Sequence, residues 1–403
     1  MGITTRETLQ ASTSGVETAR YVYNDEALRR NIDLLNEAFK AELGESFFIA
    51  YSFKTNYFEE VIKTVKDKGC YAEVVSPYEY AYAIDEGFPP DKIVYNGVIP
   101  TEYKFDAIVN GSIVNIESVD EYLMLSKMAK IDNKHIEIGI RVTFDVGNGI
   151  ESRFGVPIDD GSLDRLMALV AKDTYVNVVG FHCHIGSARG LNYWIKRAKT
   201  MASLAYAYDV KYLDLGGGLY GYMPPDLAKQ FPDYCPSFNA YAEGVCKALA
   251  PFARKGVKIF VEPGTALVGN TMDVIAHVTN IKRNGTSTYI VVDCPSSSVG
   301  FICDCKDIST VVHRTSDEPA SWQIDATIVG NSCLEFDYLK RHVYETVNIG
   351  DEIEIKNVGA YSISCARQFI TPTLPVYDTK GKLLKPAEEY VDMFRKQRSY
   401  AEN

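Results

Sequence analysis

The sequence predicts an α/β fold, with a (β/α)8 TIM barrel followed by an all-β domain. Between about residues 21 and 269, short apolar strand-like segments alternate with stretches of helical periodicity. Eight such strands are typical of this barrel. After about Asn270 the pattern changes to alternating strands and turn residues such as Asn284-Gly285, without long helical stretches. We therefore expect a barrel over residues 21–269, and a β domain from residues 1–20 and 270–403 that includes a polar N-terminal lead-in and a charged C-terminal tail.

The expected barrel strands are short, mostly apolar and separated by helical segments. A helix is expected first, because residues 27–43 carry Leu28, Ile32, Leu35 and Phe39 at helical spacing. A second helix should begin at Ser76-Pro77, a suitable N-cap followed by a proline in the first turn. The eight strands are expected at residues 47–50, 71–75, 92–95, 113–116, 137–142, 178–182, 212–215 and 257–261.

Composition narrows the class of protein. The chain has 403 residues, of which 46% are hydrophobic and 24% charged, which is typical of a globular protein with a large core. Its formal net charge of -11 argues against nucleic acid and against an anionic membrane as partners, since both require a basic surface. No apolar run approaches the roughly 18 residues that span a bilayer. The nine cysteines show no regular spacing, so we expect reduced thiols and a cytoplasmic location.

Lys54 stands just after the apolar segment 47–50, within Tyr51-Ser52-Phe53-Lys54-Thr55-Asn56. A lysine at the end of a buried strand must reach solvent, find a partner or take part in chemistry. Barrel enzymes place their active sites at these strand ends, and an amine there can hold an aldehyde cofactor as a Schiff base. We interpret Lys54 as such an amine, with a lysine that simply reaches solvent as the alternative.

The segment 180–187 places two histidines and a serine after another expected strand. His184 could stack on an aromatic ring and Ser187 could donate to a phosphate; the alternative is a histidine whose hydrogen bonds are satisfied within the barrel mouth. The nearby His182 and Cys183 suggest zinc. However, Cys183 should point away from the face that His182 and His184 share, and no second pair has the spacing of a structural zinc site. We therefore expect no metal.

Gly216, Gly217 and Gly218 directly follow the strand at 212–215. Glycines allow backbone N–H groups to turn toward an anion, and a late strand of such a barrel is a common place for a phosphate site. A flexible turn between strand and helix is the alternative.

Glu262 ends the strand at 257–261 and is followed by Pro263-Gly264-Thr265. A carboxylate at the end of an apolar strand needs a cationic or hydrogen-bonding partner. A protonated pyridine nitrogen would be one such partner, and a salt bridge to an arginine or lysine would be another.

Two further motifs lie in the expected β domain. The loop 330–337 contains Cys333, Glu335 and Asp337, and the segment 358–362 presents the phenol of Tyr361 after a glycine. A solvated loop with an inert cysteine and a core tyrosine are the alternatives.

In this order, the five motifs resemble those of the fold-type III pyridoxal-phosphate decarboxylases, which include the diaminopimelate, ornithine and arginine decarboxylases. The resemblance extends from about Tyr21 to Thr371. It implies an alanine-racemase-like barrel with a C-terminal β domain, pyridoxal 5'-phosphate as cofactor, and a homodimer with active sites at the interface. The implied reaction is release of CO2 from an amino acid or amino-acid conjugate through a Lys54 Schiff base.

The resemblance also implies roles for single residues. Glu73 would be the acid beside the cofactor lysine, with Glu79 further along the same segment. Cys333 would be supplied across the dimer interface as a catalytic proton donor. The implied cofactor-binding set is Lys54, Glu73, His184, Ser187, Gly216, Gly217, Gly218, Glu262 and Tyr361.

The chain departs from the family pattern at two places that bear on the substrate. Thr265 replaces the arginine of the family's E-P-G-R motif and supplies no charge. Leu334 stands where the ornithine and diaminopimelate enzymes carry an acid. The resemblance implies that Thr265 and Arg153 lie near the substrate, where Arg153 could compensate in part. Glu335 and Asp337 in the specificity loop keep a substrate with a distal amine possible.

Three interpretations of function follow. The first is a decarboxylase in a siderophore, antibiotic or polyamine-type pathway. The second is an amino-acid racemase on the same barrel, which the Cys333 loop disfavours. The third is a non-catalytic regulatory homologue, which the presence of Lys54, Glu262 and Cys333 together disfavours.

Overall fold

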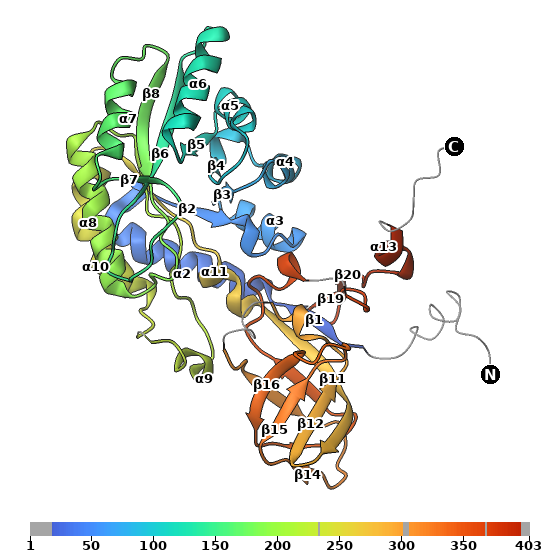
Figure 1. Cartoon of the computed structure of the whole chain (residues 1–403). Helices are drawn as coiled ribbons and strands as arrows, with labels where there is room; N and C mark the ends of the chain where they lie inside the picture. The colour runs from blue at the N-terminus through green and yellow to red at the C-terminus, as the bar shows by residue number, and fades with distance from the viewer. Residues whose placement is uncertain (1–17, 233, 301–305, 367–368, 396–403) are drawn as a thin grey trace, which may run out of the picture. The chain divides into compact units, whose positions relative to one another are not determined.

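The computed structural model describes residues 18–232, 234–300, 306–366 and 369–395 (Figure 1). The described residues form two compact units. One contains residues 26–222 and 231–268, and the other contains residues 18–25, 223–230 and 269–395. The expected division lay at residues 21 and 269. The structure places the strand that contains Tyr21 in the sheet of the second unit.

The first unit is a closed barrel of eight parallel strands, as the alternation of strands and helices predicts (Figure 1). The ring is closed because β5 and β6, at the two ends of the strand order, also pair with each other. Around the barrel the strands are β5 (Ile113–Ile116), β4 (Ile93–Tyr95), β3 (Tyr71–Val74), β2 (Phe47–Ser52), β10 (Lys258–Val261), β9 (Tyr212–Asp214), β8 (Val176–His182) and β6 (Ile136–Thr143). The short β7 (Val156–Pro157) pairs with β6 outside the ring.

Helices connect the barrel strands, and their sequences explain their ends. Helix α2 (Asp25–Leu43) buries Leu28, Ile32, Leu35 and Phe39, the apolar positions that predicted it. Ser76 caps helix α4 by accepting from the amide of Glu79, and Pro77 occupies its first turn, as expected. The other helices of this unit are α3 (Glu59–Asp67), α4 (Pro77–Asp85), α5 (Thr101–Val109), α6 (Val119–Ile131), α7 (Ser162–Val170), α8 (Leu191–Ala207), α10 (Phe238–Ala253) and α11 (Thr265–Val268).

Two strand glycines make room for an aromatic side chain inside the barrel. A Cβ on Gly180 would lie 2.3 Å from the Tyr212 ring, and a Cβ on Gly139 would lie 1.8 Å from the Tyr212 hydroxyl. Neither distance is tolerated in a packed protein. The glycines therefore allow the Tyr212 ring to pack among buried residues that include Phe260 and Val94.

The second unit is built around an antiparallel-rich sheet, in agreement with the predicted all-β domain. Strand β1 pairs antiparallel with β11 and parallel with β19. The sheet contains β1 (Arg20–Tyr23), β11 (Met272–Asn284), β12 (Ser287–Val292), β13 (Thr310–His313), β15 (Ala326–Val329), β16 (Tyr338–Val343), β18 (Glu352–Ile355), β19 (Val376–Asp378) and β20 (Leu383–Lys385). The short strands β14 (Ser321–Trp322) and β17 (Thr346–Val347) pair separately, and the unit also has helices α9 (Pro225–Ala228) and α13 (Tyr390–Arg395).

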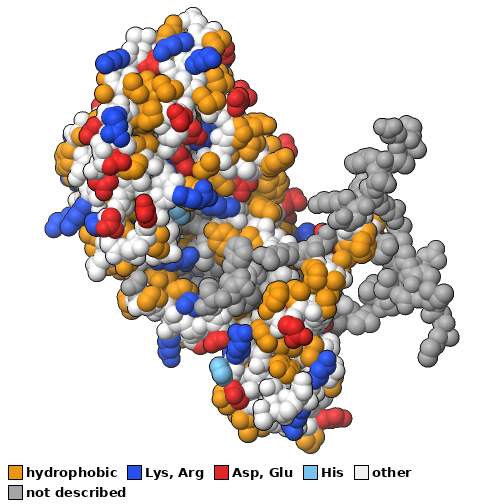
Figure 2. Space-filling view, in the orientation of Figure 1, with side chains coloured by type: hydrophobic (Ala, Val, Ile, Leu, Met, Phe, Trp, Pro, Cys, Tyr) orange, Lys and Arg blue, Asp and Glu red, His pale blue; other side chains and the backbone are white. Residues whose placement is uncertain are grey.

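The described surface carries charges of both signs. On the face shown in Figure 2, Lys and Arg side chains and Asp and Glu side chains are scattered among uncharged side chains. Within the described residues, no helix is both long enough and apolar enough to cross a membrane.

Candidate active site

Lys54 lies at the C-terminal mouth of the barrel, in a 3-10 turn directly after β2. Its side chain is 34% exposed, and its Nζ donates to Oε2 of Glu73, whose side chain is buried. The register of the sheet explains this pair, since Ser52 of β2 lies beside Glu73 of β3. The Ser52 hydroxyl also donates to Glu73 Oε2, at 2.7 Å. A buried carboxylate thus holds a solvent-accessible amine at the barrel mouth.

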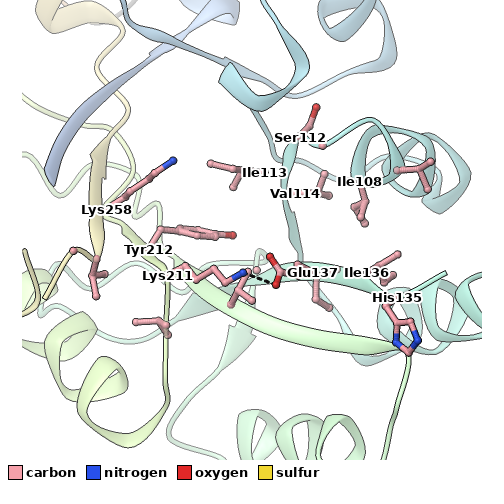
Figure 3. Close-up of a pocket in the computed structure, with 18 of the residues that line it drawn as sticks. Ile108, Ser112, Ile113, Val114, His135, Ile136, Glu137, Lys211, Tyr212 and Lys258 are labelled. Carbon is pink, nitrogen blue, oxygen red and sulfur yellow. Dashed lines mark hydrogen bonds and ion pairs between the residues drawn. The ribbon is translucent and has the colours of Figure 1, made fainter. Parts of the chain in front are cut away.

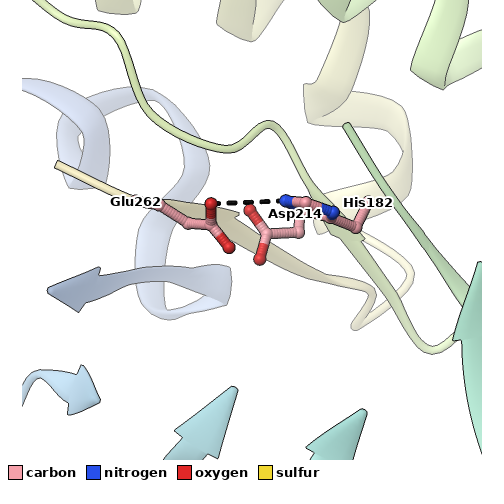
Figure 4. A group of neighbouring side chains, drawn as sticks. All are labelled: His182, Asp214 and Glu262. Carbon is pink, nitrogen blue, oxygen red and sulfur yellow. Dashed lines mark hydrogen bonds and ion pairs between the residues drawn. The ribbon is translucent and has the colours of Figure 1, made fainter. Parts of the chain in front are cut away.

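Glu262 directly follows β10 and is only 2% exposed. Its Oε2 lies 3.3 Å from Nε2 of His182, and its Oε1 accepts a 2.6 Å hydrogen bond from Nδ2 of Asn96. Asp214, the last residue of β9, completes a buried group in which one polar atom from each of His182, Asp214 and Glu262 lies within 4.8 Å of the others (Figure 4). The imidazole and carboxylate groups of this trio are ligand types that divalent cations bind. The zinc interpretation considered a different set, His182, Cys183 and His184.

The two acids of this group differ in charge. Burial on its own would raise the pKa of Glu262, but the nearby His182 and Lys54 outweigh it and hold that pKa well below its usual range. Burial, followed by the charge of Glu262, raises the pKa of Asp214 well above its usual range. At neutral pH Glu262 is therefore a carboxylate, whereas the surroundings of Asp214 disfavour its charged form. Asp214 Oδ1 accepts from the amide of Gly216 at 2.8 Å, while Oδ2 has no hydrogen-bond partner among the described residues.

The glycine turn after β9 packs too closely for other residues. Gly216 has φ +66°, and a Cβ there would lie 2.2 Å from the carbonyl oxygen of Cys183. A Cβ on Gly217 would lie 2.5 Å from the carbonyl oxygen of Glu262. The turn therefore presents its backbone beside Glu262 and His184, with the amide of Gly216 bonded to Asp214 and that of Gly217 bonded to His184.

His184 contacts this turn through its ring. Its Nδ1 accepts a 3.1 Å hydrogen bond from the amide of Gly217, so the proton of the neutral ring belongs on Nε2. Burial lowers the pKa of His184 to about 3, and the ring is neutral at physiological pH.

This pKa predicts a pH dependence of stability. Unfolded His184 titrates near 6.5, so between about pH 6.5 and 3 only the unfolded chain binds the proton. The free energy of unfolding should therefore fall as the pH drops through this range, by up to about 1.4 kcal/mol per pH unit from this group. Urea unfolding of the cofactor-free protein at several pH values should show a shallower slope for His184→Asn. The matched variant of the exposed His135, His135→Asn, should keep the wild-type slope, and an unchanged slope in His184→Asn would contradict the prediction.

Arg197 holds the Gly216–Gly218 turn through hydrogen bonds to its backbone. The sequence did not predict this residue as part of the site. It is fully buried on α8, and its guanidinium donates to the carbonyl oxygens of Leu215 and Gly217, both at 2.8 Å, and of Ile185 at 3.3 Å. This buried cation is bonded to two carbonyls at the glycine turn and to one in the segment after β8, so it ties the turn to that segment. In sequence, an arginine between lysines of a helix looks like a surface residue, so no local signal points to this role.

The remaining barrel residues of the predicted site lie around the same strand ends. Ser187 is exposed with φ +55°, and Thr265 is the partly exposed first residue of α11. Arg153 is exposed in the loop between β6 and β7, with its guanidinium carbon 3.9 Å from the centre of the Phe154 ring. Arg141, near the end of β6, lies 4.7 Å from the same ring and donates to Glu117 at 2.6 Å.

Glu79 belongs to a local cap. Its Oε2 accepts from the amide of Val75 at 2.7 Å, while its own amide donates to the Ser76 hydroxyl.

The predicted residues of the second unit lie in two loops. Cys333 and Glu335 are exposed. Asp337 is buried, and its two oxygens accept from the amides of Ser296 at 2.6 Å and Ser332 at 2.9 Å, so this carboxylate holds its own loop. Tyr361 is partly buried with φ +59°.

A lysine paired with a buried acid at the mouth of a parallel (β/α)8 barrel, next to a second buried carboxylate and a glycine turn, defines a class of enzyme that can hold an aldehyde cofactor with a basic ring. The comparison with known families specifies this class. Residues 29–269 match the family described as "Pyridoxal-dependent decarboxylase, pyridoxal binding domain". Because this match covers more than half of the chain, the protein belongs to that family, and it is a pyridoxal-dependent carboxy-lyase of amino acids.

Individual relatives agree with this assignment. The chain is 29% identical over 372 residues to a diaminopimelate decarboxylase from Aquifex aeolicus, covering 87% of this chain and 84% of the relative. It is 25% identical over 415 residues to one from Methanocaldococcus jannaschii, covering 94% and 91%. The crystal structure of diaminopimelate decarboxylase from Helicobacter pylori complexed with L-lysine has a TM-score of 0.81 at 23% identity, covering 96% of this chain and 99% of that one, which shows a shared fold.

The barrel mouth fits pyridoxal 5'-phosphate, the cofactor of this family. Lys54 supplies an amine for the aldehyde, and Glu262 supplies a charged carboxylate for a protonated ring nitrogen. The neutral ring of His184 offers a flat surface. In the Gly216–Gly218 turn the amides of Gly216 and Gly217 already donate to Asp214 and His184, which leaves the amide of Gly218 for a phosphate. None of these residues carries a charge of the same sign as the part of the cofactor that it would contact.

Proposed function

We propose that this protein decarboxylates an amino acid or amino-acid conjugate on a cofactor attached to Lys54. The observation that carries the proposal is the pairing of Lys54 with the buried Glu73, directly beside the charged Glu262, at the mouth of a pyridoxal-binding barrel. When bound, pyridoxal phosphate supplies an electron-accepting ring linked to the substrate's α-carbon.

The residues of the barrel mouth have distinct tasks in this proposal. Glu73 accepts a hydrogen bond from the Lys54 amine and so orients it at the barrel mouth, where it would hold the aldehyde of the cofactor. Glu262 would favour a protonated ring nitrogen, because a buried carboxylate strongly favours a cationic partner. The neutral His184 would offer a flat face to the ring without adding a competing charge.

We further propose a homodimer in which Cys333 of one chain completes the site of the other. The exposure of Cys333 on a loop supports this, since an exposed thiol can meet a second chain and donate a proton to the substrate's α-carbon. The exposed Glu335 on the same loop is the proposed contact for the far end of the substrate.

Substrate choice is proposed from two substitutions and from the relatives. The curated relatives act, by name, on diaminopimelate. Thr265 provides a hydroxyl rather than a positive charge, and the exposed Leu334 provides no acid. Both changes favour a substrate whose far end is less charged than that of diaminopimelate, such as a conjugated amino acid. Arg153 is the proposed contact for any anionic group there.

A panel assay of CO2 release tests the proposed function. L- and D-amino acids, diaminopimelate, lysine, ornithine and amide-linked conjugates of small diamino acids should be supplied to the reconstituted enzyme. We expect release from a conjugate at a kcat/KM at least about tenfold above that for diaminopimelate, since one lost charged contact is worth about that factor. Faster turnover of diaminopimelate would contradict the substrate proposal, and racemisation without CO2 would contradict the reaction.

The role of Cys333 predicts a specific complementation. Cys333→Ala should retain cofactor absorbance but lose about 10²–10⁴-fold in turnover, as expected for loss of a proton donor. When Cys333→Ala and Lys54→Ala proteins are mixed and allowed to exchange, activity should recover to about a quarter of the wild-type value, since half of the dimers are mixed and each has one intact site. Cys365→Ala, at a partly exposed cysteine, is the matched control and should stay active. No recovery on mixing would contradict a shared site.

We also propose a cytoplasmic location. Cys70, Cys183, Cys246, Cys333 and Cys365 are free thiols, which suits a reducing compartment. Recovery of the native protein from the cytoplasmic fraction of fractionated cells would test it.

A further inference from the structure

Three side chains connect Glu262 to the interior of the barrel through successive hydrogen bonds. Nδ2 of Asn96 donates to Glu262 Oε1 at 2.6 Å. Nδ2 of Asn115 donates to Oδ1 of Asn96 at 2.8 Å, and the Tyr212 hydroxyl donates to Oδ1 of Asn115 at 2.8 Å. All four side chains are at most 5% exposed, and they come from or directly follow four different strands, β10, β4, β5 and β9.

Two carboxylates determine the direction of every bond in this series, because Nδ2 of Asn96 donates to Glu262 Oε1 and also to Glu73 Oε1, at 3.2 Å. An ionised carboxylate only accepts, so Asn96 must present its NH2 group and turn its Oδ1 to Asn115. Asn115 must then present its own NH2 group, which leaves its Oδ1 for Tyr212. Tyr212 can therefore only donate. Each dipole points its positive end toward Glu262, and reversal of any one amide would place two acceptors or two donors against each other.

The barrel is shaped around this series. Gly139 lies where any side chain would overlap both the Tyr212 hydroxyl and Asn115 Oδ1, at 1.8 and 2.1 Å from an added Cβ. Tyr212 also lines a cavity of about 890 Å³ at the N-terminal ends of the strands, beside Lys258 and the Lys211–Glu137 ion pair (Figure 3). The series thus extends from that end of the barrel interior to the active site at the other end.

We propose that Asn96, Asn115 and Tyr212 form a relay of positioning residues that orients Glu262 and keeps it ionised to face the cofactor's ring nitrogen. The inference rests on the proposed role of Glu262. A buried polar group costs free energy unless it has a hydrogen-bond partner. Here the side chains are satisfied in the arrangement in which Asn96 donates to Glu262, with Glu73 as its second acceptor, and this arrangement stabilises a negative Glu262. Asn96 acts on Glu262 directly, while Asn115 and Tyr212 act by fixing the orientation of Asn96.

Titration of the cofactor-free protein with pyridoxal phosphate, followed by absorbance across a pH series, tests the relay. Asn96→Ala should weaken cofactor binding about 10–100-fold, the loss expected for a hydrogen bond to a charged group. Tyr212→Phe, which removes one oxygen, should weaken it about 2–10-fold. In both variants, the absorbance of the bound cofactor should show the ring nitrogen losing its proton at a lower pH than in the wild type.

A matched control and a double-mutant cycle separate positioning from simple structural support. Tyr95→Phe removes the hydroxyl of another fully buried barrel tyrosine, one that has no hydrogen-bond partner among the described residues, and should leave affinity within about twofold. In a Glu262→Gln background, Tyr212→Phe should have almost no further effect on affinity. Urea unfolding of each cofactor-free variant confirms that it is folded.

The outcomes are distinct. Wild-type affinity and pH profile in both relay variants would overturn the relay while leaving the proposed function intact. An equal loss with and without Glu262 would overturn it as well, because the relay would then act only through general stability. A wild-type chain that forms no borohydride-reducible bond with pyridoxal phosphate would overturn the proposed function, and the relay with it.

Discussion

Replacing Lys54 with alanine should abolish decarboxylation, with a loss of at least about 10³–10⁴-fold in turnover, and should remove the covalently bound cofactor. The reason is chemical, since Lys54 presents the amine that Glu73 holds at the barrel mouth. After borohydride reduction, the wild-type chain should carry the mass of the reduced cofactor on the peptide that contains Lys54, and Lys54→Ala should carry none.

Lys63 provides the control for this experiment. It is a more exposed lysine on α3 that pairs with Glu59 and Glu60 on the helix surface. Lys63→Ala should keep full activity and the reducible cofactor, because surface ion pairs contribute little. Covalently attached cofactor in Lys54→Ala would show that another amine forms the bond.

Replacing Glu262 with glutamine should lower turnover by about 10²–10³-fold while the protein still folds. Glutamine has nearly the same shape and can keep a hydrogen bond to Asn96, but it carries no negative charge. It therefore cannot keep a proton on a ring nitrogen, and the ring becomes a weaker electron acceptor. Steady-state kinetics of CO2 release, together with the absorbance of the bound cofactor, measure both effects.

Glu137 offers a matched control for charge removal. It lies on barrel strand β6, is exposed, and pairs with Lys211 near the opposite end of the barrel. Glu137→Gln should leave turnover within about twofold, as expected for an exposed ion pair. If Glu262→Gln turned over as fast as Glu137→Gln, the charge of Glu262 would have no part in the reaction.

The barrel and the main residues of its mouth could be predicted from the sequence, for a simple geometrical reason. Strands of a parallel barrel are short apolar runs between helices, so their number and order can be read along the chain. Lys54, Glu73 and Glu262 each lie at or near the end of such a run, and parallel strands bring their C-terminal ends to one mouth. Local patterns point to Lys54 and Glu262, whereas the role of Glu73 was implied by the family resemblance; the fold itself brings all three together.

The residues around Glu262 depend on contacts that no local pattern records. Asn96 and Asn115 each lie at or next to the end of an expected strand and look like ordinary turn formers. Only closure of the ring brings them into line with Tyr212 and Glu262. The raised pKa of Asp214 likewise follows from burial beside a second acid, and a sequence does not reveal burial of this kind.

The same distinction applies to the chain as a whole. Sequence alone determined the alternation of strands and helices, the change to an all-β pattern after about residue 270, and the lysine at the end of β2, because these depend on periodicity along the chain. The tertiary structure decided that β1 joins the β unit, that Arg197 holds the glycine turn, and which neighbours set the charge of Glu262. These depend on which distant segments pack together, and hydrogen bonds and pKa values are properties of that packing.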